Sequence, residues 1–166
     1  MLFRSMAHAR WATCGIKSDC NSHPHVCYRE KFIVVHNGII ENYIEIKNDL
    51  LSKNITFSSQ TDTEVIVNLI SYLHAEGFSI KSAIREALSQ LEGTWGLVVM
   101  CKDVPTKIYA ARHGSPLLIG IGENCMMIAS EQSGFANYVN NFICLRERDI
   151  VALELHLDSG EIEMTK

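Results

Sequence analysis

Residues 61–93 read TDTEVIVNLISYLHAEGFSIKSAIREALSQLEG, and this stretch predicts two consecutive helices. The first begins at Thr61, whose side chain can cap a backbone amide while Glu64, three residues on, reaches back to the chain. Its apolar residues recur at the spacing of one helix face. The second begins at Ser79 and ends before Gly93, since glycine commonly follows the last helical turn. We expect the two helices to pack antiparallel.

The remaining apolar runs are typical of strands. They lie at 32–35, 95–100, 107–111, 117–121, 125–129, 142–145 and 150–155. Several are apolar at successive positions, which predicts a sheet covered on both faces. After Gly93 the runs follow one another with turn signals and no helix between them, so we expect antiparallel order. With a weaker helical pattern at 41–51, the fold class is α+β.

Composition limits the classes of function. The chain has 166 residues, of which 47% are hydrophobic and 20% charged, as in one packed globular domain. Its net charge of −4 gives no basic field for a nucleic acid or an anionic membrane surface. No apolar stretch approaches the roughly 18 residues of a membrane-spanning helix. The six cysteines are too few for a disulfide scaffold and predict reduced thiols, so we expect a cytoplasmic protein.

Three polar segments carry the chemical signal. They are AHARWATCGIKSDCNSHPH at 7–25, VVHNGIIENY at 34–43 and SQTDTEVI at 59–66. Together they resemble the class II glutamine amidotransferase domain, specifically that of glutamine–fructose-6-phosphate aminotransferases. The resemblance continues through LEGTWGLVVM, AARHGSPLLIGIG and IASE, and so spans nearly the whole chain in order. The RWAT, HPH and HNGIIEN strings favour this hexosamine branch over the sister branch that uses phosphoribosyl pyrophosphate.

The resemblance implies both a fold and a reaction. The fold is the αββα sandwich of N-terminal-nucleophile hydrolases, in which two antiparallel sheets lie between two helix layers. The reaction releases ammonia from glutamine by acyl transfer, and the complete family enzyme uses it to convert fructose 6-phosphate to glucosamine 6-phosphate without a metal or organic cofactor. Residues 1–166 then form a partial amidotransferase domain, with the sugar isomerase domains that bind fructose 6-phosphate outside this sequence. The full-length enzyme is expected to be a homo-oligomer.

The family's substrate-binding residues match positions in two of the segments. Arg10 corresponds to the arginine that holds the α-carboxylate of glutamine, a task suited to a planar guanidinium with parallel donors. Asp62 corresponds to the carboxylate that receives the α-ammonium group. Trp11 matches the tryptophan that lines the site and gates the passage of ammonia. Thr13 belongs to the same substrate-facing strip and is expected to contact glutamine.

The family's oxyanion hole corresponds to Asn37, through its side-chain amide, and to Gly38, through its backbone N–H.

Ordinary structural alternatives exist for each motif taken alone. An Asn-Gly pair is more often a tight turn after a strand. The string at 61–64 is most often only a helix start, because acidic residues favour the first turn. The joint occurrence and order of the motifs favour the functional interpretation.

The family's nucleophile is an N-terminal cysteine whose own α-amine serves as the base. This sequence begins Met1-Leu2, so we expect the family's first strands to be missing and the chain alone to be inactive. Cys14 begins a Cys-Gly-Ile string like that at the family's start, but an internal cysteine has no free α-amine, and cleavage before it would discard Arg10. Ala9 and Cys14 replace the family's usual threonine and histidine. The alternatives are a noncatalytic glutamine-binding or regulatory module and a gene remnant that folds poorly.

A metal site is the remaining alternative for the N-terminal segment. Six potential ligands fall within twenty residues, namely His8, Cys14, Cys20, His23, His25 and Cys27. Their spacing lacks the paired short intervals of structural zinc sites. His23 and His25 also match the family's His-Pro-His string, which is not a metal site there. We therefore predict no metal.

Overall fold

The computed structural model describes residues 5–9, 15–122, 125–135, 138–139, 141–156 and 162–166. The helices in this part of the chain are α1 (Tyr43–Ser52), α2 (Asp62–Ala75), α3 (Ile80–Ser89) and the 3₁₀ helices η1 (Asp19–Asn21) and η2 (Gln132–Phe135). The strands are β1 (His25–Val26), β2 (Phe32–Ile40), β3 (Gly93–Cys101), β4 (Lys107–His113), β5 (Leu118–Ile121), β6 (Met126–Ala129), β7 (Asn141–Cys144), β8 (Ile150–Leu155) and β9 (Ile162–Thr165).

The strands form two sheets. The larger has the order β1-β2-β3-β4-β8-β9 and the smaller the order β6-β5-β7. Every pairing is antiparallel, which confirms the order predicted from the succession of strands after Gly93. The prediction missed the two edge strands β1 and β9, and it ended β2 at residue 35, five residues too early.

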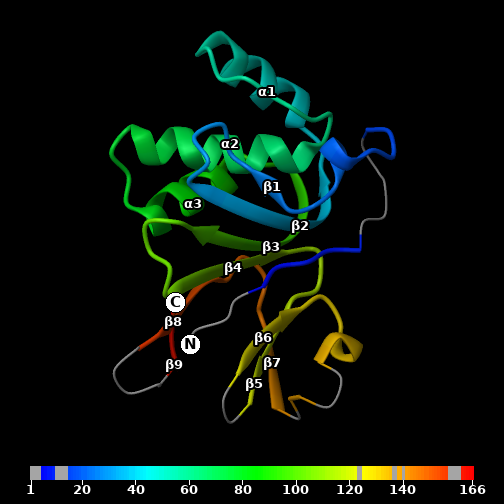
Figure 1. Ribbon diagram of the computed structural model, residues 1–166, viewed down its shortest axis with the longest axis vertical. Coiled ribbons are helices and arrows are strands. Elements are labelled where there is room, and N and C mark those ends of the chain that lie inside the picture. The colour runs from blue at the N-terminus through cyan, green and yellow to red at the C-terminus, as the bar shows by residue number, and fades with distance from the viewer. Residues whose placement is uncertain (1–4, 10–14, 123–124, 136–137, 140, 157–161) are drawn as a thin grey trace.

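Three layers are visible in Figure 1. Helices α2 and α3 cover one face of the six-stranded sheet, and the three-stranded sheet lies on the opposite side. Buried side chains such as Ile66 and Ile84 join the helices to the large sheet. A second buried cluster, which includes Leu117, Ile119 and Val151, fills the space between the sheets. The large sheet is therefore covered on both faces, as its apolar strands predicted.

The outer face of the small sheet is covered by η2 and by Val139. A Cβ placed on Gly120 would lie 2.7 Å from a methyl group of Val139 and 3.1 Å from the ring of Phe135. Phe135 is buried and its ring also contacts Phe142 of β7. Within the described residues, η2 thus occupies the position where the predicted four-layer sandwich has its second helix layer.

The start of α2 differs from the predicted capping box in one detail. The Thr61 hydroxyl accepts the backbone N–H of Glu64 at 3.3 Å, so Thr61 is the N-cap as predicted. The Glu64 carboxylate does not return to the N–H of Thr61. It accepts the backbone N–H groups of Ser58 at 2.7 Å and Ser59 at 2.6 Å. Glu64 therefore fixes the loop before α2 rather than the cap residue itself.

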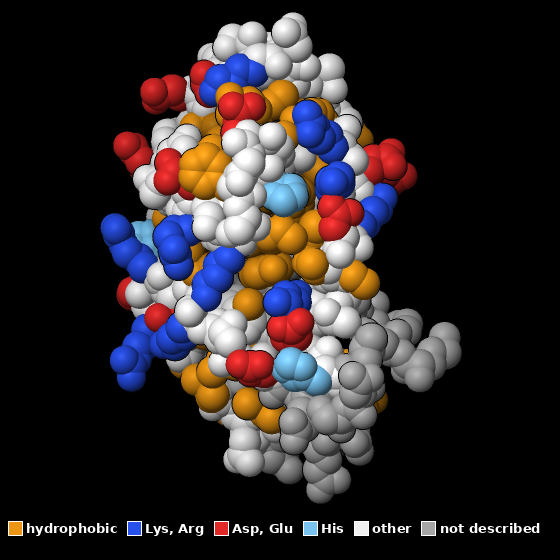
Figure 2. Space-filling model, turned by 90° about the vertical axis from the view of Figure 1, so that its left-hand side faces the viewer, with side chains coloured by type: hydrophobic (Ala, Val, Ile, Leu, Met, Phe, Trp, Pro, Cys, Tyr) orange, Lys and Arg blue, Asp and Glu red, His pale blue; other side chains and the backbone are white. Residues whose placement is uncertain are grey.

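The surface carries charges of both signs. Figure 2 shows basic and acidic side chains mixed over one face of the molecule. Some charges form exposed pairs, such as Lys31 with Asp103 at 2.8 Å. This mixture fits the small net charge of the sequence. No helix in the described part of the chain is long and apolar enough to cross a membrane.

Candidate active site

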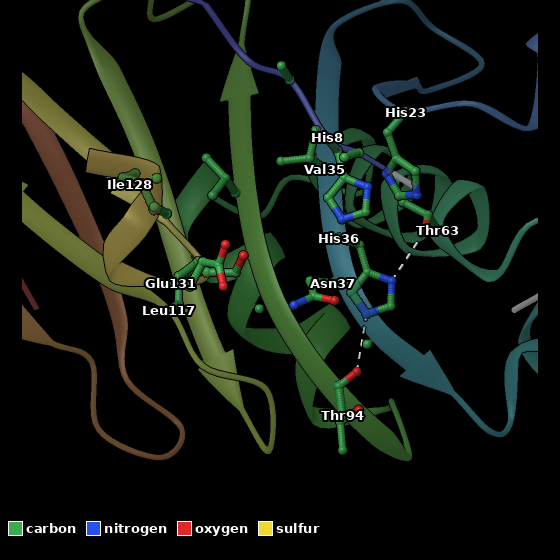
Figure 3. Close-up of a pocket in the computed structure, with 18 of the residues that line it drawn as sticks. His8, His23, Val35, His36, Asn37, Thr63, Thr94, Leu117, Ile128 and Glu131 are labelled. Carbon is green, nitrogen blue, oxygen red and sulfur yellow. Dashed lines mark hydrogen bonds between the residues drawn. The ribbon is translucent and has the colours of Figure 1, made fainter. Parts of the chain in front are cut away.

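A cavity of about 730 Å³ opens between the two sheets. One wall consists of β2, β3 and the N-terminus of α2, with Asn37, Asp62 and Thr94 among its residues. The opposite wall consists of Leu117, Ile128 and the residues that follow β6 (Figure 3). Residues 7–9 also line this cavity, so the N-terminal segment meets both sheets there.

Asn37 and Gly38 lie within β2, on the cavity wall. They pair with Gly96 and Trp95 of β3, so the alternative of a tight turn at Asn37-Gly38 is wrong. Figure 3 shows the Asn37 side chain extending into the cavity. Gly38 has φ +145°, and a Cβ there would lie 2.1 Å from the carbonyl oxygen of Thr94. Only glycine therefore fits this close approach of β2 to β3.

Asp62 is the first residue of α2 and is 4% exposed. Its Oδ2 atom accepts the backbone N–H of Ile40 at 2.9 Å. A carboxylate at a helix N-terminus is stabilised by the helix dipole. The same residue thus lines the cavity and joins α2 to the end of β2. The sequence predicted the helix start and the ligand role, but not this bond to the strand.

His36 is a buried cavity residue that the sequence interpretation did not single out. Its Nδ1 atom lies 3.2 Å from the Thr63 hydroxyl, and its Nε2 atom lies 3.1 Å from the Thr94 carbonyl oxygen (Figure 3). Nδ1 is also 3.9 Å from Oδ2 of Asp62. Burial lowers the pKa of His36, although Asp62 and the Thr94 carbonyl act in the opposite direction. The sequence did contain a sign of this role, because His36 is a polar residue that directly follows the apolar run at 32–35.

A row of three histidines begins at the cavity, where His8 and His23 line the wall. The rings of His8 and His23 have centroids 4.4 Å apart, and those of His23 and His25 are 5.0 Å apart. His25 reaches the Thr61 hydroxyl at 3.1 Å, so the row ends at the cap of α2. Burial, together with the nearby His36, lowers the pKa of His8. In the described part of the chain, no three metal-ligating side chains are grouped so as to hold an ion.

Several predicted site residues lie outside the described residues. These are Arg10, Trp11 and Thr13; Cys14, which the sequence analysis rejected as the nucleophile, also lies outside them. The chain on either side of them is described. Ala9 lines the cavity, and the backbone N–H of Ile16 donates to Gln60, the residue before the cap of α2, at 3.3 Å.

Glu131 is a carboxylate on the wall opposite Asn37. It follows β6 and is exposed, and Figure 3 shows it directed into the cavity. Its Oε1 atom accepts the hydroxyl of Ser133 at 2.6 Å. The cavity thus offers an amide and a glycine backbone on one strand, a buried carboxylate at a helix start and an exposed carboxylate across from them.

Comparison with known proteins shows the family to which the chain belongs. A family model described as the glutamine amidotransferase domain matches residues 8–137. The glutamine–fructose-6-phosphate aminotransferase of Clostridium perfringens is 43% identical over 148 residues, which are 89% of this chain and 24% of that protein. The enzyme of the same name from Thermococcus kodakarensis is 40% identical over 165 residues, covering 96% of this chain and 27% of that protein. The chain thus spans about a quarter of the length of these curated relatives.

Solved structures show the same fold. An allosteric regulatory enzyme of purine biosynthesis superposes with a TM-score of 0.76 at 25% identity, covering 96% of this chain and 34% of that one. The glutamine phosphoribosylpyrophosphate amidotransferase of B. subtilis superposes with a TM-score of 0.71 at 26% identity, with the same coverage. These neighbours confirm the predicted α+β fold of the N-terminal-nucleophile hydrolase type. The chain belongs to the glutamine amidotransferase domain family.

Proposed function

We propose that this chain is the glutamine-hydrolysing part of a glutamine–fructose-6-phosphate aminotransferase. In this role it releases ammonia from glutamine for the synthesis of glucosamine 6-phosphate from fructose 6-phosphate. The two curated relatives described above carry that name at 40% and 43% identity, whereas the two solved structures share only 25% and 26%. This difference supports the hexosamine branch. Binding of fructose 6-phosphate and assembly into a homo-oligomer are proposed for the complete protein.

One observation carries the proposal: Asp62, Asn37 and Gly38 line a single cavity. The Asp62 carboxylate would receive the α-ammonium group of glutamine. The Asn37 amide and the Gly38 N–H would donate to the side-chain carbonyl oxygen, whose negative charge grows as the tetrahedral intermediate forms. A cavity of about 730 Å³ falls within the range of about 300–1,000 Å³ typical of small-molecule sites.

The remaining roles follow from the family resemblance. Arg10 is proposed to hold the α-carboxylate, Thr13 to contact the substrate, and Trp11 to gate ammonia on its way to the sugar site. The nucleophile of this reaction is an N-terminal cysteine in the family, and we assign that role to none of the cysteines in residues 1–166. The reaction is proposed to need no metal or organic cofactor.

The state of the cysteine thiols supports a proposal about the cellular location of the protein. All five described cysteines, which include Cys27 and Cys101, are free. Burial raises the pKa of Cys101, which keeps that thiol protonated and unreactive. Free thiols are typical of a reducing compartment, and we therefore propose that the protein works in the cytoplasm.

The test is titration of the full natural protein with L-glutamine, with D-glutamine as the stereochemical control. Saturable binding of one L-glutamine per chain, with D-glutamine much weaker, would support the proposal. Release of ¹⁵N-ammonia from glutamine labelled at the side-chain amide would establish hydrolysis. Binding without release would instead favour the noncatalytic glutamine-binding module. A folded protein that binds no L-glutamine at millimolar concentration would contradict the proposal.

A further inference from the structure

His36 lies between the two groups proposed to recognise glutamine. Its side chain is 1% exposed. On one side, Nδ1 faces the first turn of α2, at 3.9 Å from Oδ2 of Asp62. On the other side, Nε2 lies only 2.9 Å from the point that a Cβ of Gly38 would occupy. The imidazole ring therefore fills the space between Asp62 and the strand that carries the oxyanion donors.

The hydrogen bonds of the ring fix its tautomer. The Thr94 carbonyl can only accept, so the proton of the ring lies on Nε2, which donates to it. Nδ1 then has a lone pair and accepts the hydroxyl proton of Thr63. The ring is thus a rigid connection among three elements, namely β2, β3 and α2.

Burial keeps the ring neutral, against the effect of the groups around it. The titratable groups that face it are Asp62 from α2 and His8 from the N-terminal segment, while β3 presents the Thr94 carbonyl. Burial lowers the pKa of His36 despite the nearby carboxylate. A second proton would place an N–H on Nδ1, where it would compete with Ile40 for Oδ2 of Asp62. While His36 is neutral, the Asp62 carboxylate therefore keeps its hydrogen bond from the backbone N–H of Ile40.

We propose that His36 is a positioning residue that fixes the distance between Asp62 and the Asn37–Gly38 oxyanion hole. It would thereby select ligands whose α-ammonium group stands at the glutamine spacing from the side-chain amide. This inference rests on the proposed function, because it takes Asp62 as the ammonium site. Thr63 transmits the position, since it is the helical residue next to Asp62 and the one that the ring contacts.

The experiment compares two ligands on the full natural protein. L-glutamine has the α-ammonium group, and glutaramate is the same molecule without it. His36→Leu removes both hydrogen bonds of the ring with little change in volume. Thr63→Val removes only the hydroxyl, and Thr63→Ser restores it as the matched control. Asp62→Asn is the reference variant in which the preference for L-glutamine over glutaramate should be lost completely. Affinities are measured well below each variant's melting temperature.

We expect the wild-type protein to prefer L-glutamine over glutaramate at least about tenfold, as a charge-assisted hydrogen bond allows. His36→Leu should reduce this preference at least about fivefold and Thr63→Val at least about threefold, while Thr63→Ser stays within about 1.5-fold of wild type. If His36 had a purely structural role, its replacement would lower the affinities for both ligands by the same factor and leave their ratio unchanged.

The outcomes separate the two proposals. If Asp62→Asn abolishes the preference while folded His36→Leu and Thr63→Val retain it, the positioning role is wrong and the glutamine site stands. If the wild-type protein binds L-glutamine no better than glutaramate, the ammonium site at Asp62 and with it the positioning role of His36 fail. A folded wild-type protein that binds neither ligand would contradict the proposed function itself. Should His36→Leu not fold, the Thr63 pair decides, because Val and Ser differ at that position only in the hydroxyl and methyl groups.

Discussion

Asp62 and Ile40 are joined by a hydrogen bond of 2.9 Å from the strand backbone to the helix carboxylate, although they are 22 residues apart. The bond fixes the first turn of α2 against the end of β2. Gly38 lies two residues earlier on that strand. The carboxylate proposed to bind the ammonium group and the backbone proposed to bind the oxyanion therefore belong to one rigid unit.

Replacing Asp62 with asparagine should weaken glutamine binding at least about tenfold, because a neutral amide loses the charge-assisted bond to the α-ammonium group. The asparagine carbonyl can still accept the N–H of Ile40, so the fold should persist. Calorimetric titration with L-glutamine measures the effect. Asp49→Asn, which changes an exposed carboxylate on α1, is the matched control. Equal affinities of the two variants would argue against Asp62 as the ammonium site.

Gly38→Ala should destabilise the protein by about 3 kcal/mol, because the added Cβ meets the Thr94 carbonyl and φ is positive. Gly77→Ala is the control: Gly77 also has a positive φ, of +102°, but no atom lies within 4 Å of its added Cβ. Backbone strain alone should cost that variant about 1–2 kcal/mol. Urea unfolding measures both. Similar losses for the two variants would show that the close contact between β2 and β3 is unimportant.

Asn37→Ala should lower the rate of ammonia release by about 10²–10³-fold, as loss of one oxyanion donor does in other acyl-transfer enzymes. Because Asn37 is exposed in the cavity wall, we expect a stability change within about 0.5 kcal/mol. Steady-state kinetics of the full natural protein would measure the rate, with Asn48→Ala, an exposed position on α1, as the control. A rate equal to that of the control would remove Asn37 from the oxyanion hole.

Glu64 should make the free energy of unfolding depend on pH in the acid range. Burial raises the pKa of its carboxyl, but the hydrogen bonds from Ser58 and Ser59 outweigh burial, so the folded pKa lies below the ordinary value of 4.5. The resulting stability is present above pH 4.5 and is lost as the pH falls through the folded pKa. Denaturant unfolding between pH 7 and pH 3 should therefore show a smaller acid loss for Glu64→Gln than for wild type. The exposed control Glu45→Gln should keep the wild-type loss; a Glu64→Gln profile parallel to wild type would contradict the assignment.

His36 should remain neutral and carry its proton on Nε2 at pH values where an ordinary histidine titrates. Its folded pKa is lowered by burial from the ordinary 6.5, so the unfolded chain takes up its proton first. The contribution of His36 to the free energy of unfolding is therefore fully present above pH 6.5, and it is lost as the pH falls through the pKa of the folded state. Imidazole ¹⁵N shifts should show a protonated Nε2 and an unprotonated Nδ1 at pH 6.5. A half-titrated ring at that pH would contradict this account.

The helices could be predicted from sequence because their signals are local. Thr61 and Ser79 cap the starts of α2 and α3, and the apolar residues between the caps recur at helical spacing. The extent of β2 could not be predicted in the same way. Asn37 and Gly38 have turn propensity, and only pairing with residues 93–101, far along the chain, holds them in a strand.

The candidate site could be predicted only in part. Asn37, Gly38 and Asp62 belong to motifs that the family resemblance identifies, and the structure brings them to one cavity. His36 belongs to the same string but depends on Thr63 and Thr94, which are 27 and 58 residues away. A local pattern cannot show such contacts. The predicted roles of Arg10, Trp11 and Thr13 stay predictions.

We infer that glutamine binds in this cavity between Asp62 and the strand that carries the oxyanion donors. A crystal structure of the natural protein with L-glutamine tests it most directly. We expect the α-ammonium nitrogen about 3 Å from the Asp62 carboxylate and the side-chain carbonyl oxygen about 3 Å from the Asn37 amide and the Gly38 nitrogen. Glutamine bound outside the cavity, or reversed with its side-chain amide at Asp62, would contradict it.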